Sequence, residues 1–113
     1  MKKIYLACPY THNSALVKEH RFKFANHIAA QLMKAGNIVF SPISHSHPIA
    51  TQCGLDMGLE FWMAQDLSFI QWCDELVVLT IKGWEESKGV TREIEIASYM
   101  KKEIRYLRYP YEL

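Results

Sequence analysis

Several features that would place this 113-residue chain in a special class are absent from its sequence. No run of 18 apolar residues occurs, so we expect no membrane-spanning helix and no membrane partner. The cysteines are an odd number without CxxC spacing, and we interpret them as reduced thiols of a cytoplasmic protein: Cys8, Cys53 and Cys73. The formal net charge is only +1, which gives no reason to expect a nucleic-acid polymer as a partner.

The start of the chain, MKKIYLACPY, is too short and turns polar too soon for a signal peptide, so we interpret it as a first strand. What is present is the composition of a globular protein, with 50% hydrophobic and 22% charged residues. A chain of 113 residues can bury a core without disulfides. We therefore expect a single domain that spans residues 1–113.

The chain alternates between predicted strands and predicted helices. Short apolar runs predict strands at residues 3–8, 37–41, 75–80 and 103–107. Apolar residues at helical spacing predict helices at residues 15–35, at residues 58–72 and over roughly 12 residues from near 87–89. Residues 42–58 are predicted to form a long connecting loop, and a loop of that length in a small domain is usually functional.

This alternation predicts an α/β fold with three layers. The order βαβαβαβ implies a short parallel sheet with helices on both faces, and we expect the flavodoxin-like strand order 2-1-3-4. In such sheets ligands bind beyond the carboxyl ends of the strands, where the strand order reverses. The loops at that point are residues 9–14 and 81–87. The second loop leads into a helix whose free N–H groups and dipole favour a phosphate.

Two acidic residues fall where packing would favour leucine. At about 100° per residue Glu93 lies inside the apolar arc of its helix, whereas Glu95 lies on the polar side. The preceding helix has an apolar stripe formed by Leu59, Trp62, Met63, Leu67 and Ile70. Asp66 lies in the middle of that stripe. A covered carboxylate is costly unless it is paired or used, so the two acids suggest a shared site. The alternative for Glu93 is a stripe-edge position that reaches solvent or a basic partner.

Three stretches are distinctive in combination: KIYLACPY at the start, QDL at 65–67 followed by CDELVV at 73–78, and SKGVTREIEIA at 87–97. Together they resemble the nucleoside 2-deoxyribosyltransferase superfamily, which includes 2′-deoxynucleoside 5′-monophosphate N-glycosidases. More narrowly, ACPY, FSPISHSHPIA and GWEESKGV resemble a small uncharacterised bacterial and phage family within that superfamily. Two departures stand out. The first loop, CPYTHNS, has no glycines, and the chain ends soon after the last strand.

The resemblance implies roles for individual residues. Glu93 matches the nucleophile, Asp66 matches the aspartate near the sugar and base, and Tyr5 matches the tyrosine that positions the glutamate. Ser87 falls where the nucleotide hydrolases have a phosphate-binding serine. The mechanism implied needs no metal and no cofactor. The resemblance also implies a homo-oligomer, and the aromatic tail at residues 108–113 is expected either to pack on a neighbouring subunit or to fray.

Further substrate contacts are expected from both loops and from the SPISHSHP segment. The candidates are Pro9, Tyr10, Ser14, His45, His47, Trp84 and Gly89. Arg21 and Lys88 are possible phosphate partners, although an ordinary surface charge is the plainer interpretation of each. The two histidines with a cysteine form an alternative, a transition-metal site, but His-x-His without a second ligand pair is a weak signal. We expect the histidines instead to line the mouth of the pocket, and the alternative for His45 is a solvated loop position.

The function that the resemblance implies for these residues is cleavage of an N-glycosidic bond. The substrate is a nucleoside or a (deoxy)nucleoside 5′-monophosphate, and the base is either released or exchanged. Glu93 attacks the sugar and Asp66 protonates the leaving base. The alternative is a non-catalytic nucleotide-binding or nucleotide-sensing domain, in which the same loops hold a ligand without breaking it.

Overall fold

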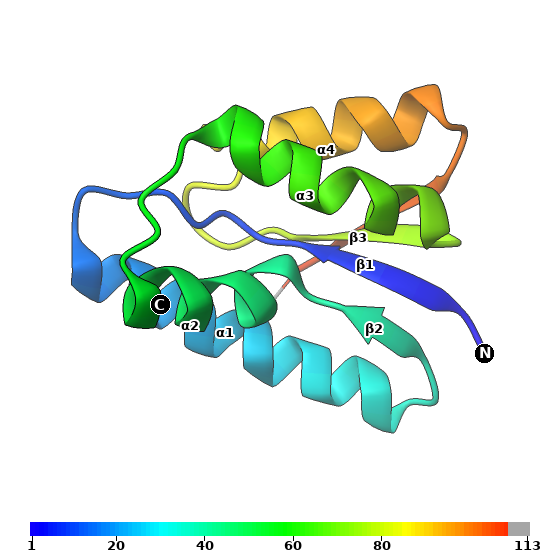
Figure 1. Cartoon of the computed structure of the whole chain (residues 1–113). Coiled ribbons are helices and arrows are strands. Elements are labelled where there is room, and N and C mark those ends of the chain that lie inside the picture. Colours follow the sequence, from blue (N-terminus) through cyan, green and yellow to red (C-terminus); the bar gives the residue numbers. More distant parts are fainter. Residues whose placement is uncertain (109–113) are drawn as a thin grey trace.

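A computed structural model describes residues 1–108 of the chain (Figure 1). Its elements in chain order are β1 (Lys3–Ala7), α1 (Ala15–Lys34), β2 (Ile38–Phe40), α2 (Pro42–Cys53), α3 (Leu59–Trp72), β3 (Glu75–Leu79), α4 (Lys88–Tyr99) and β4 (Glu103–Leu107). The four predicted strands and the three predicted helices are confirmed, with ends that agree closely. Of the aromatic tail at residues 108–113, all but Arg108 lies outside the described residues.

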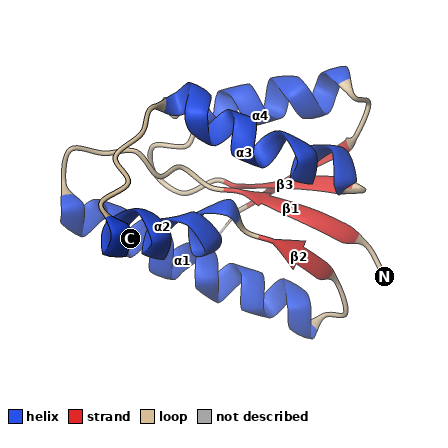
Figure 2. Cartoon of the chain, viewed as in Figure 1, coloured by secondary structure: helices blue, strands red, loops and turns tan. Residues whose placement is uncertain are grey.

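The four strands form one parallel sheet in the predicted order, β2-β1-β3-β4. In the sheet β1 pairs on both sides, so that Tyr5 lies opposite Phe40 of β2 and Leu76 of β3. Figure 2 shows the two helical layers, with α1 and α2 on one side of the sheet and α3 and α4 on the other. This is the expected three-layer α/β fold. Within residues 1–108 no helix combines the length and the apolar character needed to cross a bilayer.

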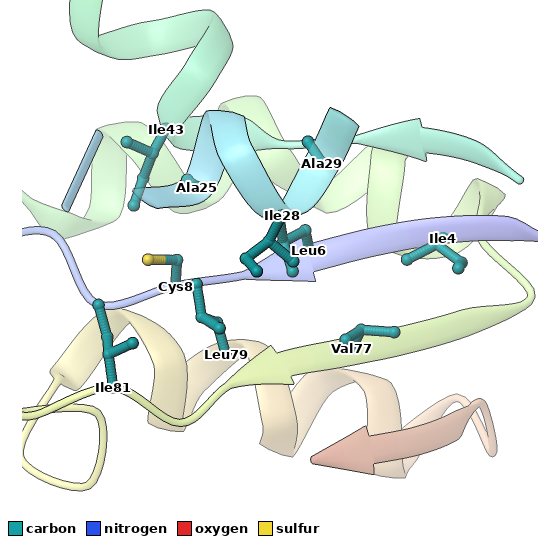
Figure 3. Packing of buried hydrophobic residues seen from close by; sticks show 10 residues of the cluster. All are labelled: Ile4, Leu6, Cys8, Ala25, Ile28, Ala29, Ile43, Val77, Leu79 and Ile81. Carbon is teal, nitrogen blue, oxygen red and sulfur yellow. The ribbon is translucent and has the colours of Figure 1, made fainter. Parts of the chain in front are cut away.

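Both central strands, β1 and β3, are buried on their two faces. Side chains alternate along a strand, so Ile4 and Leu6 enter the apolar cluster that packs under α1 and α2 (Figure 3). Tyr5 and Ala7 enter the second cluster, under α3 and α4. Each large apolar side chain removed from water stabilises the fold by about 1.5–3 kcal/mol. The same alternation delivers the side chain of Tyr5 to the α3/α4 side of the sheet.

The prediction of one long loop over residues 42–58 was wrong. Most of this stretch is the helix Pro42–Cys53, and only residues 54–58 connect it to α3. Both ends of the helix follow known preferences. Pro42 occupies a first-turn position, where its missing N–H costs nothing, and Gly54 adopts the left-handed conformation after the last turn, with φ at 65°.

Pro48 is the reason why the sequence favours a loop in this region. It lies inside α2, where a proline removes one backbone hydrogen bond and disfavours a helix. Packing against α1 compensates for that loss. Ile43 joins the apolar cluster under α1, and the buried ring of His47 lies 4.4 Å, centroid to centroid, from the ring of Phe22. Tertiary contacts therefore outweigh the local preference here.

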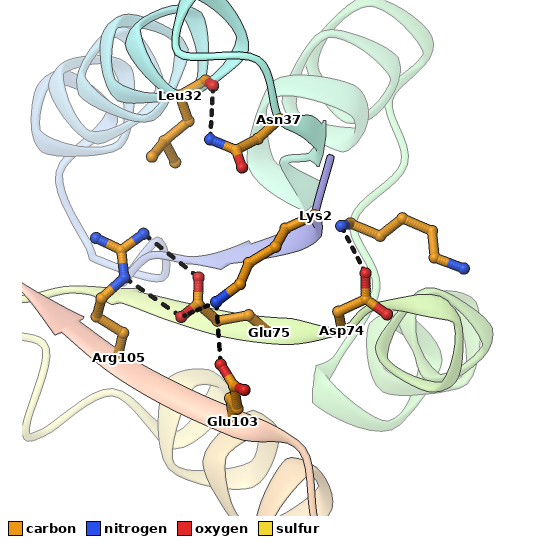
Figure 4. A network of polar contacts seen from close by, with 8 residues as sticks. Lys2, Leu32, Asn37, Asp74, Glu75, Glu103 and Arg105 are labelled. Atoms are coloured by element: carbon orange, nitrogen blue, oxygen red, sulfur yellow. Dashed lines mark hydrogen bonds and ion pairs between the residues drawn. The ribbon is translucent and has the colours of Figure 1, made fainter.

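A polar network joins the amino-terminal ends of the strands (Figure 4). Glu75 opens β3 and is only 5% exposed, yet its carboxylate accepts from Lys2 Nζ at 3.5 Å and from Arg105 Nη2 at 3.3 Å. Lys2 also pairs with the exposed carboxylate of Glu103 at 3.0 Å. A buried carboxylate is stable only with such partners, so these cations fix β1 and β4 to β3.

Arg105→Ala should destabilise the protein by about 1–3 kcal/mol, because it leaves the buried Glu75 with one of its two cationic partners. Glu103→Ala is the matched control. It removes the exposed partner of Lys2 and should change the midpoint of urea unfolding only slightly. Adding Glu75→Gln to Arg105→Ala should restore part of the lost stability. Equal losses in the two single variants would contradict the special importance of Glu75.

Candidate active site

Three side chains from three different elements meet on the α3/α4 side of the sheet. Tyr5 comes from β1, Asp66 from α3 and Glu93 from α4, and their exposed fractions are 0%, 7% and 5%. The Tyr5 hydroxyl donates a short hydrogen bond to Glu93 Oε2. The charge of Asp66 also raises the pKa of Glu93, and Tyr5 affects the pKa of both acids, so we treat the two carboxyl groups as one electrostatic unit.

Helical spacing explains why both acids are covered. The buried residues of α4 are Val90, Glu93 and Ala97, and those of α3 are Met63, Asp66 and Ile70. In each helix the acid lies three residues after one buried apolar residue and four before the next, which is one face of an α-helix. The predicted burial of both acids is confirmed. The prediction for Leu67 was wrong, because it lies beyond the edge of the α3 stripe and is 38% exposed.

Burial perturbs the protonation of both acids. It raises the pKa of Glu93 from 4.5 to about 8, against the opposing effect of the Tyr5 hydrogen bond, and the Asp66 charge raises it further. Burial likewise raises the pKa of Asp66 to about 6. The pKa of Tyr5 lies well above its usual value because the phenol is buried beside these carboxylates. Near neutral pH the acid pair therefore holds about one proton.

Cys8, which lies in the apolar cluster under α1 and α2, does not offer a second nucleophile. Cys8 follows β1, and burial raises the pKa of its thiol to about 12. A thiol with such a pKa remains protonated at neutral pH, and the thiolate is the reactive form. The chemistry available at this site is therefore that of the two carboxyl groups and the phenol.

The start of α4 offers hydrogen-bond donors next to the acid pair. Ser87 is its N-cap, and Ser87 Oγ accepts from the backbone N–H of Val90 at 3.2 Å. Within residues 1–108 the backbone N–H groups of Lys88 and Gly89 have no hydrogen-bond partner. An added Cβ at Gly89 would make only ordinary contacts, so nothing in the described chain requires glycine there. Such a helix start suits an anion.

Two of the expected contacts from the first loop are engaged with α1 and α2. Tyr10 packs against the α1/α2 cluster, and its hydroxyl hydrogen-bonds His47 Nδ1 at 2.6 Å. Ser14 caps α1, with its Oγ accepting from the backbone N–H of Val17. Pro9 is buried directly after Cys8. The structure therefore groups Tyr10 with His47, away from the apolar cluster that contains Tyr5.

The two loop histidines occupy different surroundings. His47 is buried, and its Nε2 lies 2.8 Å from a carboxylate oxygen of Glu19. His45 is exposed, with its ring 5.8 Å from that of Phe40. Among the described residues no group of three or more histidine, cysteine or acidic side chains is arranged to hold a metal ion.

Trp84 lies in the second loop, where it packs against the apolar cluster that contains Tyr5 and also contacts the edge strand β4. Its ring centroid is 5.6 Å from that of Tyr106 on β4. The two rings line a shallow hollow of about 610 Å³ together with Thr80, Glu85 and Arg108. The structure thus places Trp84 beside β4.

The role of Arg21 escaped the sequence analysis. Its guanidinium donates to backbone carbonyls of both loops, those of Tyr10 and Thr11 in the first and that of Lys82 in the second. Every residue has a backbone carbonyl, so the sequence does not reveal which carbonyls accept from an arginine. Only one residue in the sequence indicated this contact. That residue is Gly83 in the second loop, which has φ at 95° and lies directly beside the guanidinium.

Comparison with known proteins agrees with the geometry at the level of the fold. A family model described as "Domain of unknown function (DUF1937)" matches residues 2–108. No curated protein matches the sequence. A solved structure, "2-desoxiribosyltransferase from Leishmania mexicana", superposes with a TM-score of 0.63 at 15% identity and covers 96% of this chain. The chain spans 65% of the length of that structure. The likeness shows a nucleoside deoxyribosyltransferase-like fold.

Proposed function

The chain belongs to the family described as Domain of unknown function (DUF1937), and from this premise we propose that it is an enzyme that cleaves N-glycosidic bonds. The proposed substrate is a nucleoside or a (deoxy)nucleoside 5′-monophosphate. One observation carries the proposal. Two buried carboxyl groups, Asp66 and Glu93, form one electrostatic unit, and a tyrosine hydroxyl orients the second of them. Buried acids with raised pKa are costly to keep and are typical of catalytic sites.

In the first step Glu93 is the nucleophile. A carboxylate oxygen of Glu93 bonds to the anomeric carbon as the bond from that carbon to the base breaks, and the bonding electrons leave with the base. Asp66 donates its proton to the departing base. With a pKa of about 8 for Glu93 and about 6 for Asp66, the single proton of the resting pair lies on Glu93, and it must pass to Asp66 to give the reactive form, in which Glu93 is ionised. The hydrogen bond that Tyr5 donates to Glu93 favours this form, because it stabilises the ionised carboxylate.

In the second step an acceptor frees the enzyme. With water as acceptor, its oxygen bonds to the anomeric carbon, its proton passes to the Asp66 carboxylate, and Glu93 leaves as a carboxylate. With a second nucleobase as acceptor, the same step transfers the sugar. Either route returns both acids to their starting protonation and requires no metal ion or cofactor. The solved structure with the similar fold is named a desoxiribosyltransferase, which supports including transfer in the proposal.

The start of α4 supports a 5′-monophosphate among the substrates. The N–H groups of Lys88 and Gly89 and the hydroxyl hydrogen of Ser87 are all donors, and the helix dipole favours negative charge at this end. Glu93 lies less than two helical turns from Ser87, so a nucleotide could place its phosphate on the donors and its sugar beside the acid. The absence of a side chain at Gly89 leaves room for the phosphate.

The proposal extends to assembly and location. We propose a homo-oligomer, which is what the resemblance to the nucleoside 2-deoxyribosyltransferase superfamily implies. A cytoplasmic location is proposed from the three free cysteines, Cys8, Cys53 and Cys73, since exported proteins usually pair theirs. Light scattering during size-exclusion chromatography measures the assembly, and a monomer at micromolar concentration would contradict it.

A substrate screen tests the proposed function. The purified protein is incubated with a mixture of deoxynucleosides, ribonucleosides and their 5′-monophosphates, and free bases are measured by mass spectrometry. We expect release of at least one base above the level of a no-protein control. A second arm adds a foreign base and measures new nucleosides, which separates transfer from hydrolysis. No free base and no exchange with any substrate would overturn the proposal.

One observation favours a second candidate, a non-catalytic nucleotide sensor. Glu93 and Asp66 are almost fully covered, so a ligand could occupy the start of α4 without touching either acid. A sensor would show ligand-induced thermal stabilisation without base release. In a sensor Glu93→Gln would leave that stabilisation unchanged.

A further inference from the structure

We propose that Arg21 is a positioning residue that joins the two loops beside the candidate active site. The loops are residues 9–14, which follow β1, and residues 81–87, which precede α4. By tying them, Arg21 fixes the start of α4 relative to the rest of the sheet. The consequence for catalysis rests on the proposed function, whereas the tie itself does not.

The guanidinium of Arg21 reaches both loops at once. Its Nη1 donates to the carbonyl oxygens of Thr11 at 3.1 Å and of Tyr10 at 3.4 Å. Its Nη2 donates to the carbonyl oxygen of Lys82 at 3.3 Å. A guanidinium is always charged and holds its donors in a rigid fork, so one side chain can span two backbone segments. Two of its three nitrogens are thereby committed to the protein rather than to a phosphate.

Gly83 is shaped to receive this side chain. Its φ of 95° is a left-handed conformation that side chains disfavour. A Cβ added at this position would lie 2.5 Å from Arg21 Nη2, which is closer than atoms can approach. The guanidinium would have to shift, and a shift would weaken its hydrogen bond to the Lys82 carbonyl. The glycine thus serves both the turn and the close approach of Arg21.

The first loop is the firmly held side of this tie. The Tyr10 hydroxyl bonds to His47, and His47 bonds in turn to Glu19 of α1. Lys18 Nζ lies 5.8 Å from the centre of the Tyr10 ring, within range of a cation–π contact. Residues of both α1 and α2 therefore hold the Tyr10 side chain in place, and Arg21 donates a hydrogen bond to the backbone carbonyl of the same residue.

The second loop is the side that Arg21 controls. It consists of two tight turns, in which Trp84 N donates to the Ile81 carbonyl at 3.1 Å and Ser87 N donates to the Trp84 carbonyl at 3.3 Å. It ends at Ser87, the N-cap of the helix that carries Glu93. Any shift of this loop moves the anion-binding end of α4 relative to the first loop. Small shifts of a bound sugar are costly to catalysis, because the reacting atoms must be aligned closely.

The Arg21→Lys variant separates positioning from simple charge. Lysine keeps the positive charge but offers a single ammonium, which cannot span the two loops as the forked guanidinium does. We therefore expect amide hydrogen exchange to accelerate by roughly tenfold in both loops, residues 9–14 and 81–87, in the intact protein. In Gly83→Ala the second loop is strained at φ 95° whatever Arg21 does, so the diagnostic result for this variant is faster exchange in the first loop, residues 9–14. Lys23→Ala, an exposed change on the same helix, is the matched control and should leave both loops unchanged.

Kinetics with a substrate from the screen provide the second arm. Arg21→Lys should lower kcat by about 10–100-fold, with a smaller change in KM, since alignment rather than charge is lost. The factor should be the same for a nucleoside and for its 5′-monophosphate. A loss confined to the monophosphate would overturn the positioning role and identify Arg21 as a phosphate ligand instead.

The exchange measurement requires no substrate, so it can refute the role of Arg21 independently of the proposed enzymatic function. Unchanged exchange in either loop of a folded Arg21→Lys variant refutes the tie, whatever the activity. Absence of base release from every substrate refutes the proposed function and leaves the exchange result standing. Circular dichroism establishes whether each variant is folded. If Arg21→Lys does not fold, exchange in the first loop of Gly83→Ala tests the tie instead.

Discussion

Glu93→Gln should lower the rate of base release by at least about a thousandfold, to the level of the background, because the amide cannot form the covalent bond to the sugar. Glutamine is nearly isosteric and its side-chain oxygen still accepts from the Tyr5 hydroxyl, so the fold and substrate binding should survive. The measurement is free base formed per unit time, together with ligand-induced thermal stabilisation as a gauge of binding.

Glu95→Gln is the control for this variant. Glu95 lies two residues further along α4, has the same charge and is exposed, so its loss should leave the rate within about twofold of the parent. Activity that survives in Glu93→Gln would remove Glu93 from the mechanism. Equal losses in the two variants would indicate a general effect of charge on α4 rather than a nucleophile.

The same Glu93→Gln variant should be more stable than the parent at alkaline pH and equally stable in acid. The pKa of Glu93 is about 8 in the folded protein and 4.5 as its ordinary value. Below pH 4.5 the acid is protonated in both states and costs nothing. Between these values only the folded state keeps the proton, so rising pH favours unfolding, and above pH 8 the full penalty applies. Glutamine removes the penalty.

The expected gain is about 2–4 kcal/mol at pH 8.5, which corresponds to roughly 10 °C in the midpoint of thermal unfolding. At pH 4.5 the gain should be close to zero. Differential scanning calorimetry of both proteins at the two pH values measures the difference. Glu95→Gln again serves as control and should show no such dependence, because Glu95 is exposed. An equal gain at the two pH values would show that burial of the charge is not its cause.

The acid pair was accessible to sequence analysis because helical spacing is a strong signal. Asp66 and Glu93 interrupt regular apolar stripes, and the position of a stripe alone indicates which face of a helix is covered. The sheet order was accessible for a similar reason, since alternating strands and helices leave few allowed topologies. Side chains alternate between the two faces along β1, so Tyr5 lies on the face opposite to that of Ile4 and Leu6.

Other features depend on contacts that leave no local trace. Helix α2 was missed because Pro48 argues against a helix within a few residues, whereas the packing that favours the helix comes from α1. The orientation of Tyr10 depends on His47, which lies 37 positions away. Arg21 acts on carbonyl oxygens, which every residue possesses. In each case the deciding partner is distant in the chain, and one sequence does not specify it.

The division of labour between the two helical layers has a practical consequence for redesign. The acid pair depends on β1, α3 and α4, whereas the first loop is secured from α1 and α2 through Arg21, His47 and their partners. Substitutions confined to α1 and α2 would therefore change the contacts that hold the first loop and leave the acid pair with its present neighbours. A combinatorial library restricted to these two helices would measure how far that loop can vary while the α3/α4 side of the sheet stays unchanged.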